Sequence, residues 1–311
     1  MKLSLRQKFN AYLGMTKINI LMFFKEKSTM FFSMLAPLIV FVLYIVFLKD
    51  TYLSGIYNDV EPLKEFFDIN DIENVANAWL LAGVLGTCTI TVALNSLQVM
   101  VGDKEKKIDY DYNSSPISGS IVVLSYFTGA FINTFLISAG ILSVGLIVLS
   151  LIGNLYLTAT TVVLLFLVTI LGCASSTLIM MIVVSFFKSS SALGAFSGII
   201  SAVVGFVIGA YIPLGSFDTS IQGVLALVPG SHIACLYRNL LMNGVLENIN
   251  ASLMNVDNGE LVNALKDVFA LNLNLFTYSV KEAFMYIYSG ASIVIALGGN
   301  ILLYRLASKR S

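Results

Sequence analysis

Hydrophobic residues along this chain gather into long stretches without charge, separated by short charged or polar breaks. Residues 28–48 form the first such stretch, and residues 76–101 form the apolar part of the second. A charged side chain at the centre of a bilayer costs roughly 2.5 to 3.5 kcal/mol, and about 20 apolar residues suffice to cross one. Both stretches therefore predict membrane-spanning helices.

A third block, residues 113–186, also contains no charged residue but is too long for a single span. Turn-forming residues mark two breaks, at residues 113–116 and at residues 153–154. The block therefore predicts two spans, over residues 118–150 and 156–187.

Lys188 interrupts the apolar pattern, and two further spans follow it. The fifth is predicted over residues 190–213, with the helix-breaking Pro213 at its end, and the sixth over residues 283–304. The pattern thus predicts an all-α integral membrane protein with six transmembrane helices.

Composition and charge distribution support this class and give it an orientation. Of 311 residues, 57% are hydrophobic and 12% are charged, and the formal net charge is zero, so no nucleic-acid partner is indicated. If both termini are cytoplasmic, the inner segments hold 13 Lys and Arg against 5 Asp and Glu, and the outer segments hold the reverse. Cytoplasmic loops carry the Lys and Arg excess, so both termini are expected on the cytoplasmic side of the cell membrane.

The N-terminal segment, residues 1–27, has the pattern of an amphipathic helix lying on the inner leaflet. Its apolar face is formed by Leu5, Phe9, Tyr12, Leu13, Thr16, Ile20 and Phe23. A plain cytoplasmic extension of the first span is the alternative interpretation.

The loop at residues 103–112 combines mixed charges with apolar positions, which suits a short helix that docks against a cytoplasmic partner. The predicted docking residues are Asp103, Lys104, Glu105, Lys106, Lys107, Ile108, Asp109 and Tyr110. A solvated turn is the alternative.

Small residues recur every three or four positions along the fifth span and predict a face for close helix packing. They are Gly194, Gly198, Ser201, Gly205 and Gly209. The partner is either a neighbouring span or the same helix of a second copy.

Polar residues also occur on the second span, where Thr87, Thr91 and Asn95 are candidates for lining a transport pathway. Such side chains serve equally well as hydrogen-bond links between membrane helices, so both interpretations stay open.

Residues 214–282 separate the last two spans and are expected on the outer side. The apolar run between Pro213 and Pro229 is too short to cross the bilayer and predicts a re-entrant or interfacial helix. Residues 243–282 are more polar and predict a small external elaboration.

Several kinds of chemistry are not indicated. The chain has no G-x-x-x-x-G-K-[ST] motif for ATP phosphates, a single histidine (His232) and three widely spaced cysteines, so neither ATP hydrolysis nor a metal site is predicted. The six predicted membrane cores lack ionisable residues, which disfavours an ion-coupled transporter or an intramembrane enzyme.

Three features together resemble the permeases of the ABC-2 family, the type V exporters of bacteria. The first is the amphipathic N-terminal helix, and the second is the charged loop leading into the Ser-Pro-Ile-Ser sequence at residues 115–118. The third is the Gly-Ala-Tyr-Ile-Pro-Leu sequence at residues 209–214, with Tyr211 and Pro213, followed by Pro229 at the start of Pro-Gly-Ser-His.

The resemblance implies a permease, paired with a second copy or a homologous permease, resting on two ABC ATPase subunits that bind ATP and Mg²⁺ in its place. Spans two and five would line the path, with paired re-entrant helices at the outer face, and the cargo would be a drug, an antimicrobial peptide or a lipid. Two alternatives remain: a membrane sensor or immunity subunit that binds a peptide without transport, and an ATP-independent transporter or channel.

Overall fold

The computed structural model describes residues 4–44, 54, 66–253, 257–276 and 278–308. The elements before the central helices are α1 (Leu5–Lys25), α2 (Lys27–Ser33) and α3 (Leu35–Leu43). The long middle helices and their linkers are α5 (Asn70–Ser96), α6 (Gln98–Glu105), α7 (Ile108–Ser114), α8 (Gly119–Ile152), α9 (Ala159–Ser185) and α10 (Ser190–Val207). The remaining elements are the 3-10 turn Leu214–Ser216, α11 (Thr219–Leu225), α12 (Pro229–Ser252), α13 (Glu260–Val268), β1 (Leu273–Leu275), β2 (Tyr278–Val280) and α14 (Glu282–Ser308).

Most of these elements form a bundle of long helices, and 82% of the structure is helical. Within the described residues, five helical segments are long and apolar enough to cross a membrane, and two bent helix pairs raise that number to as many as seven. The strands form only a two-stranded antiparallel hairpin in which Leu273 pairs with Val280. The predicted class, an all-α integral membrane protein, is confirmed.

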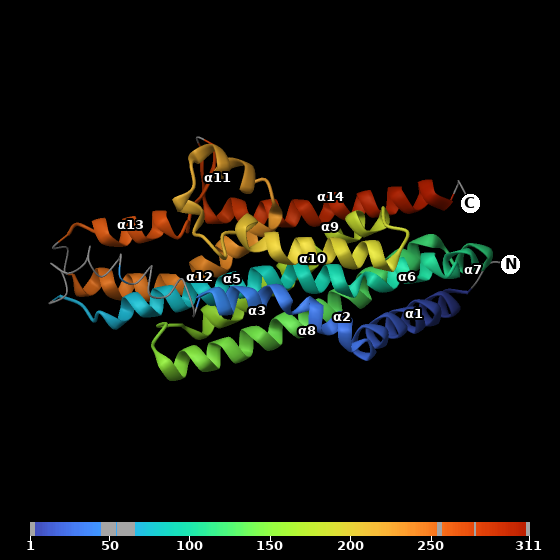
Figure 1. The fold of residues 1–311 in the computed structure, drawn as a ribbon, viewed down its shortest axis with the longest axis horizontal. Helices are drawn as coiled ribbons and strands as arrows, with labels where there is room; N and C mark the ends of the chain where they lie inside the picture. The colour runs from blue at the N-terminus through green and yellow to red at the C-terminus, as the bar shows by residue number, and fades with distance from the viewer. Residues whose placement is uncertain (1–3, 45–53, 55–65, 254–256, 277, 309–311) are drawn as a thin grey trace.

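Helix α5 is the centre of the bundle (Figure 1), in contact with α2, α3, α8, α9, α10 and α12. In its most apolar stretch, 89% of the residues are buried, compared with 17% in α8 and in α14. The side chains of α8 and α14 that remain exposed are mainly aliphatic and aromatic, as expected for surfaces that lipid covers.

The amphipathic N-terminal helix and the first predicted span are joined by a sharp bend. Helix α1 is capped by Ser4, whose hydroxyl accepts from the Gln7 N–H, and it meets the α2–α3 segment at an angle of 81°. Thr16 and Phe23 are buried, whereas Leu5 remains 85% exposed. The bend suits a helix that lies along a membrane surface and then turns into it; residues 45–48 of the predicted span lie outside the described residues.

The fifth span is shorter than predicted. Helix α10 ends at Val207, not at Pro213, because Gly209 adopts a φ of +71° and turns the chain back. Pro213 instead introduces the 3-10 turn that follows. The proline was expected to stop the helix, but a glycine four residues earlier does so.

The region between the last two spans contains a larger buried element than the polar sequence indicated. Pro229 occupies the first turn of the 24-residue helix α12, which meets α11 at an angle of 102°. Most of α12 is buried against α5, α9 and α14. The segment predicted as a re-entrant or interfacial helix contains α11, the first member of a bent pair, and the second member, α12, is a core helix.

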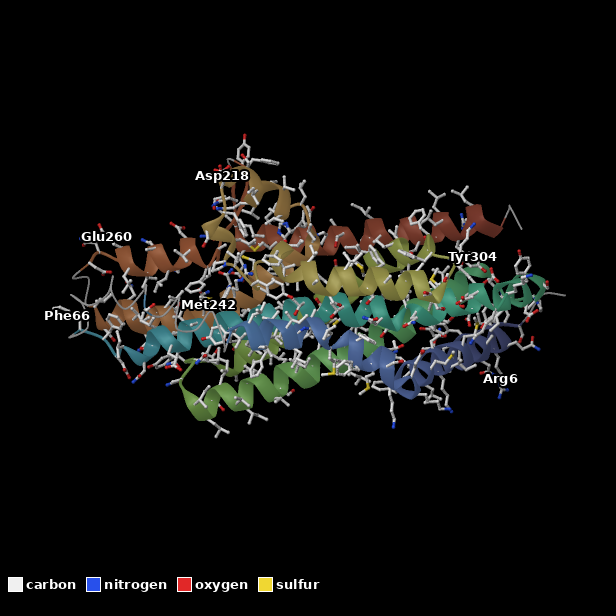
Figure 2. All side chains as sticks on the ribbon, in the orientation of Figure 1. Arg6, Phe66, Asp218, Met242, Glu260 and Tyr304 are labelled. Carbon is white, nitrogen blue, oxygen red and sulfur yellow. The ribbon has the colours of Figure 1, made fainter. Side chains whose placement is uncertain are left out.

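The two ends of the bundle carry different features (Figure 1). The start of α1, helix α7 and the end of α14 lie at one end, which we call the α7 end; α13 and the end of α12 lie at the other, the α13 end. Arg6 and Tyr304 mark the α7 end in Figure 2, and Phe66 and Glu260 mark the α13 end. The predicted docking loop and both chain ends thus share one side.

Substitution of Gly244 by Ala should destabilise the protein, because the new Cβ would lie 2.7 Å from the carbonyl oxygens of Leu155 and Tyr156. Overpacking of this kind costs about 1–3 kcal/mol. The measurement is thermal unfolding in detergent, with Gly290→Ala as the control, since no atom lies within 4 Å of a Cβ at that position. Equal unfolding temperatures for the two variants would contradict the packing described here.

Candidate functional site

At the α7 end, the first predicted docking residue is a buried carboxylate. Asp103 is 6% exposed and accepts a hydrogen bond of 2.5 Å from the Tyr126 hydroxyl of α8. Asp103 therefore fixes α6 to α8 and is withdrawn from any partner protein. It also affects Tyr112 on α7: burial raises the pKa of the Tyr112 phenol, and the charge of Asp103 raises it further, so this hydroxyl stays protonated.

The next two predicted docking residues bind the ends of two other helices. The Lys104 ammonium donates to the Ser185 carbonyl at the end of α9 (2.8 Å), and the Glu105 carboxylate accepts from the Ser190 N–H at the start of α10 (3.0 Å). Each charge matches the helix dipole that it meets, a cation at a C-terminus and an anion at an N-terminus. Residues 103–105 thus connect α6 to α8, α9 and α10.

The remaining predicted docking residues form an outward surface. Lys107, with a φ of +61°, separates α6 from α7. Lys106, Lys107 and Tyr110 are exposed, and Tyr110 keeps 55% of its surface accessible. Ile108 and Asp109 are half-buried beside them. We call Lys106, Lys107 and Tyr110 the α7 surface.

The three candidate pathway residues of α5 are buried and hydrogen-bonded. The Thr91 hydroxyl donates to the Ser33 carbonyl of α2 (2.8 Å), and the Ser197 hydroxyl of α10 donates to the Asn95 side-chain oxygen (3.0 Å). The Thr87 hydroxyl donates to the Val84 carbonyl of its own helix. Thr91 and Asn95 therefore link helices, and Thr87 does not.

A cavity of about 120 Å³ lies where the α1–α2 bend faces α5 and α6. Asn95, Ser96, Gln98 and Asp103 contribute polar groups to it, and Phe23 is among its apolar walls. The Ser96 hydroxyl is buried and lacks a hydrogen-bond partner among the described residues. The cavity places Asn95 beside an empty space at the α7-end side of the bundle.

The five small residues of α10 divide into two groups. No atom lies within 4 Å of a Cβ built at Gly194 or Gly198, and both residues are exposed. Ser201, Gly205 and Gly209 are buried within the chain itself. The predicted stripe thus serves internal packing at and just after the C-terminal end of α10 and leaves an uncovered face near its start.

The buried group explains the Gly-Ala-Tyr-Ile-Pro sequence. After Gly209 reverses the chain, the Tyr211 ring folds back onto α10 and its hydroxyl donates to the Ser201 carbonyl (3.3 Å). A Cβ at Gly205 would lie 2.4 Å from the ring, so only glycine leaves room for it. We call this reversal, residues 208–213, the α10 corner.

The α10 corner is held by a residue that the sequence patterns missed. Arg238 of α12 is fully buried, and its Nη2 atom donates to the Ile208 carbonyl and, at 2.9 Å, to the Gly209 carbonyl. Its Nε and Nη1 atoms find no hydrogen-bond partner within the described part of the chain. The signal available in the sequence was one arginine in the otherwise uncharged stretch between Asp218 and Glu247.

Near the α13 end, a second buried carboxylate joins three segments. Asp71 of α5 is 1% exposed and accepts from Asn248 of α12 (2.7 Å), from Asn74 (3.1 Å) and from the Tyr156 hydroxyl (3.5 Å). Tyr156 has a φ of +51°. All these donors are neutral, and no cluster of three His, Cys, Asp or Glu residues suited to a metal occurs in the described residues. This network is a structural clamp between α5, α12 and the α8–α9 connection.

Replacement of Gly205 by Ala should lower the unfolding temperature. The new Cβ would clash with the Tyr211 ring, which cannot easily move away because its hydroxyl is bonded to the Ser201 carbonyl. The expected cost is about 1–3 kcal/mol. Gly140→Ala on α8 is the control, since no atom of the described residues lies within 4 Å of a Cβ there. Thermal unfolding of both variants in detergent checks this, and a stable Gly205→Ala variant would contradict the packing of the corner.

Comparison with known proteins identifies the family. The model of the family described as "ABC-2 family transporter protein" matches residues 56–303, which is most of the chain. A search of curated proteins and a search of solved structures gave no match. Permeases of this family are normally non-catalytic subunits that work with an ABC ATPase. The chain belongs to the ABC-2 family of transporter proteins and is the permease component of an ABC transporter.

Proposed function

We propose that this permease exports an amphipathic or apolar compound across a bacterial cell membrane, with ATP bound and hydrolysed by separate subunits that dock at the α7 end. The observation that carries the proposal is the α7 surface. It presents two exposed lysines and an exposed tyrosine directly beside the residues that tie α6 to α8, α9 and α10. A partner bound there would act on three long helices at once.

The orientation proposed is the one with both termini and the α7 end in the cytoplasm. The Lys and Arg excess of the segments at this end supports it, because cytoplasmic loops carry that excess. The α13 end, the clamp at Asp71 and the hairpin would then face outward.

A second permease, identical or homologous, is proposed to cover the open face of α10. Gly194 and Gly198 leave space for close backbone approach, and Ile199 beside them is 62% exposed. Small residues flanked by aliphatic ones are typical of helix pairs in membranes. The path for cargo would run along the α5 and α10 side of such a pair.

The substrate class follows from what lies near this path. Leu, Phe, Ile and Val make up most of the large hydrophobic side chains that are exposed, while polar groups, Asn95 among them, border the cavity near the α7 end. A volume of about 120 Å³ is smaller than the roughly 300 Å³ at which drug-sized sites begin. The cavity suits a small polar part of an otherwise apolar cargo, such as a lipid, a drug or an antimicrobial peptide.

Reversing the charge of the α7 surface should weaken ATPase association. In the double variant Lys106→Glu and Lys107→Glu, ATPase activity that co-purifies with the tagged permease should fall at least tenfold. The double variant Lys266→Glu and Lys281→Glu changes the same charge at the α13 side and should retain full activity. Equal recovery from both would overturn the docking proposal, and no recovery with the unaltered protein would favour the peptide-sensor function instead.

Filling the open face of α10 should weaken permease pairing without unfolding the chain. Gly198→Ile places a branched side chain where the partner backbone is proposed to lie, so the dimer fraction in native mass spectra should fall several-fold. Gly290→Ile adds the same side chain to α14 at a position that is also free of neighbours. Unchanged pairing in Gly198→Ile would show that the partner does not bind here.

A further inference from the structure

Helix α10 is held at both ends by charged side chains that belong to other elements. At its first residue, Ser190, the backbone N–H donates to the Glu105 carboxylate of α6. At its end, the carbonyls of Ile208 and Gly209 accept from the Arg238 guanidinium of α12. An 18-residue helix, about 27 Å long, thus lies between an anion and a cation.

The two charges match the dipole of α10 at both termini. A carboxylate is attracted to the exposed N–H groups at a helix start, and a guanidinium to the free carbonyls at a helix end. The Glu105 contact is therefore lost if α10 moves away from α6, and the Arg238 contact is lost if it moves away from α12. Both contacts persist only when α6 and α12 move together with α10.

The outer contact is the stiffer of the two. Arg238 is fully buried, and its acceptors in the described residues are the two carbonyls of the α10 corner. Separation of α12 from the corner would leave a buried charge without acceptors, which is far less favourable than the loss of an exposed contact. The corner and α12 should therefore move together.

The other two helices bound by residues 103–105 are not held by charges at both ends. Lys104 binds the last turn of α9, whose opposite end is capped locally by Thr158. Helix α9 meets α12 along its middle, where the Tyr237 hydroxyl donates to Thr169. Asp103 binds Tyr126 within α8. Of these three helices, α10 is the one that ends at the carbonyls held by α12 of the bent pair.

We propose that Glu105 and Arg238 are positioning residues that make α10 a strut, which transmits displacement of the α7 end to the bent pair α11–α12. This inference rests on the proposed function, since an ATPase docked at the α7 surface supplies the displacement. The spare Nε and Nη1 donors of Arg238 let the guanidinium gain acceptors when the corner shifts, without leaving α12.

The test uses the permease purified with its ATPase in lipid nanodiscs and a reporter at the outer end. Asp218→Cys precedes α11, is exposed, and makes no side-chain cap bond, while the three native cysteines are buried. Labelling by a membrane-impermeant maleimide is timed without nucleotide and after trapping with ATP and orthovanadate. The ratio of the two rates measures how far the outer end follows the ATPase.

In the reporter protein, the two rates should differ several-fold. Glu105→Ala should bring the ratio at least halfway to one while ATP hydrolysis continues, and Glu105→Gln, which keeps an acceptor for Ser190, should fall between. Asp111→Ala removes a neighbouring exposed carboxylate for which the described residues show no hydrogen bond to α10, and it should keep the full ratio. An unchanged ratio in Glu105→Ala would overturn the inference.

Arg238→Lys, which keeps the charge but loses the fork of donors, gives a second and independent readout. Residues one helix length apart with no shared partner normally show additive effects. A strut predicts that the double variant of Glu105→Ala and Arg238→Lys lowers the ratio no further than the stronger single variant. If the losses of the rate ratio in the two single variants add up in the double variant, Glu105 and Arg238 each affect only local packing, and the strut is wrong.

The outcomes separate the strut from the permease function. If ATPase activity co-purifies but the reporter rate does not respond to trapping, the strut is wrong and the permease function stands. If no ATPase co-purifies, the proposed function fails, and the strut inference falls with it.

Discussion

The constraint on which this structure depends is that backbone polar groups inside a membrane need hydrogen-bond partners within the protein. Helix α10 stops inside the bundle at Val207. The N–H groups of residues 208–211 and the Ser231 hydroxyl bind the carbonyls of its last turn, but the two carbonyls that follow, those of Ile208 and Gly209, need donors from elsewhere. Gly209 lets the chain reverse, and Arg238 reaches from α12 to donate to the carbonyls of Ile208 and Gly209. Without that guanidinium, the reversal would have to lie at the surface, and α12 could not pack so deeply against α5.

Close approach of helices around α5 is the second requirement, and glycines meet it at particular points. A Cβ at Gly83 would lie 2.9 Å from the Ala210 Cβ, and one at Gly172 would lie 2.7 Å from a methyl of Ile233. The α10 corner therefore packs directly on α5, and α12 packs directly on α9. Because interiors this dense do not deform continuously, a shift of the corner moves whole helices.

The sequence predicted the positions of the long apolar helices well, and the points where helices end and connect poorly. Charge-free stretches place α8, α9 and α14 within a few residues of their observed bounds, because the cost of charge in lipid leaves few alternatives. The end of α10 was misplaced by six residues, from Pro213 to Val207, since a glycine in a left-handed turn has no pattern as plain as a proline. For the site, the sequence marked the loop at residues 103–112 as a short charged helix that docks a cytoplasmic partner, and this docking role stays a prediction. Which of its charges face inward could not be predicted, because it depends on where Ser185 and Ser190 lie in three dimensions.

The burial of α12 was also beyond sequence reasoning, and its cause lies in the same arginine. A helix containing Arg238, Asn239 and His232 has the composition of an external segment, yet each of these side chains is buried. The backbone carbonyls that bind them belong to the α10 corner for Arg238, to Leu271 between α13 and β1 for Asn239, and to Ala226 at the end of α11 for His232. The buried polar side chains of α12 thus find hydrogen-bond acceptors in backbone segments that are not regular helix. An irregular backbone and a polar helix would each be unfavourable alone in the core, and together they satisfy one another. The place where the helical pattern fails is therefore also where the end of α10 is joined to α12, through Arg238, and to α5, through the close approach of Ala210 to Gly83, so a displacement of α10 along its axis acts on both helices there.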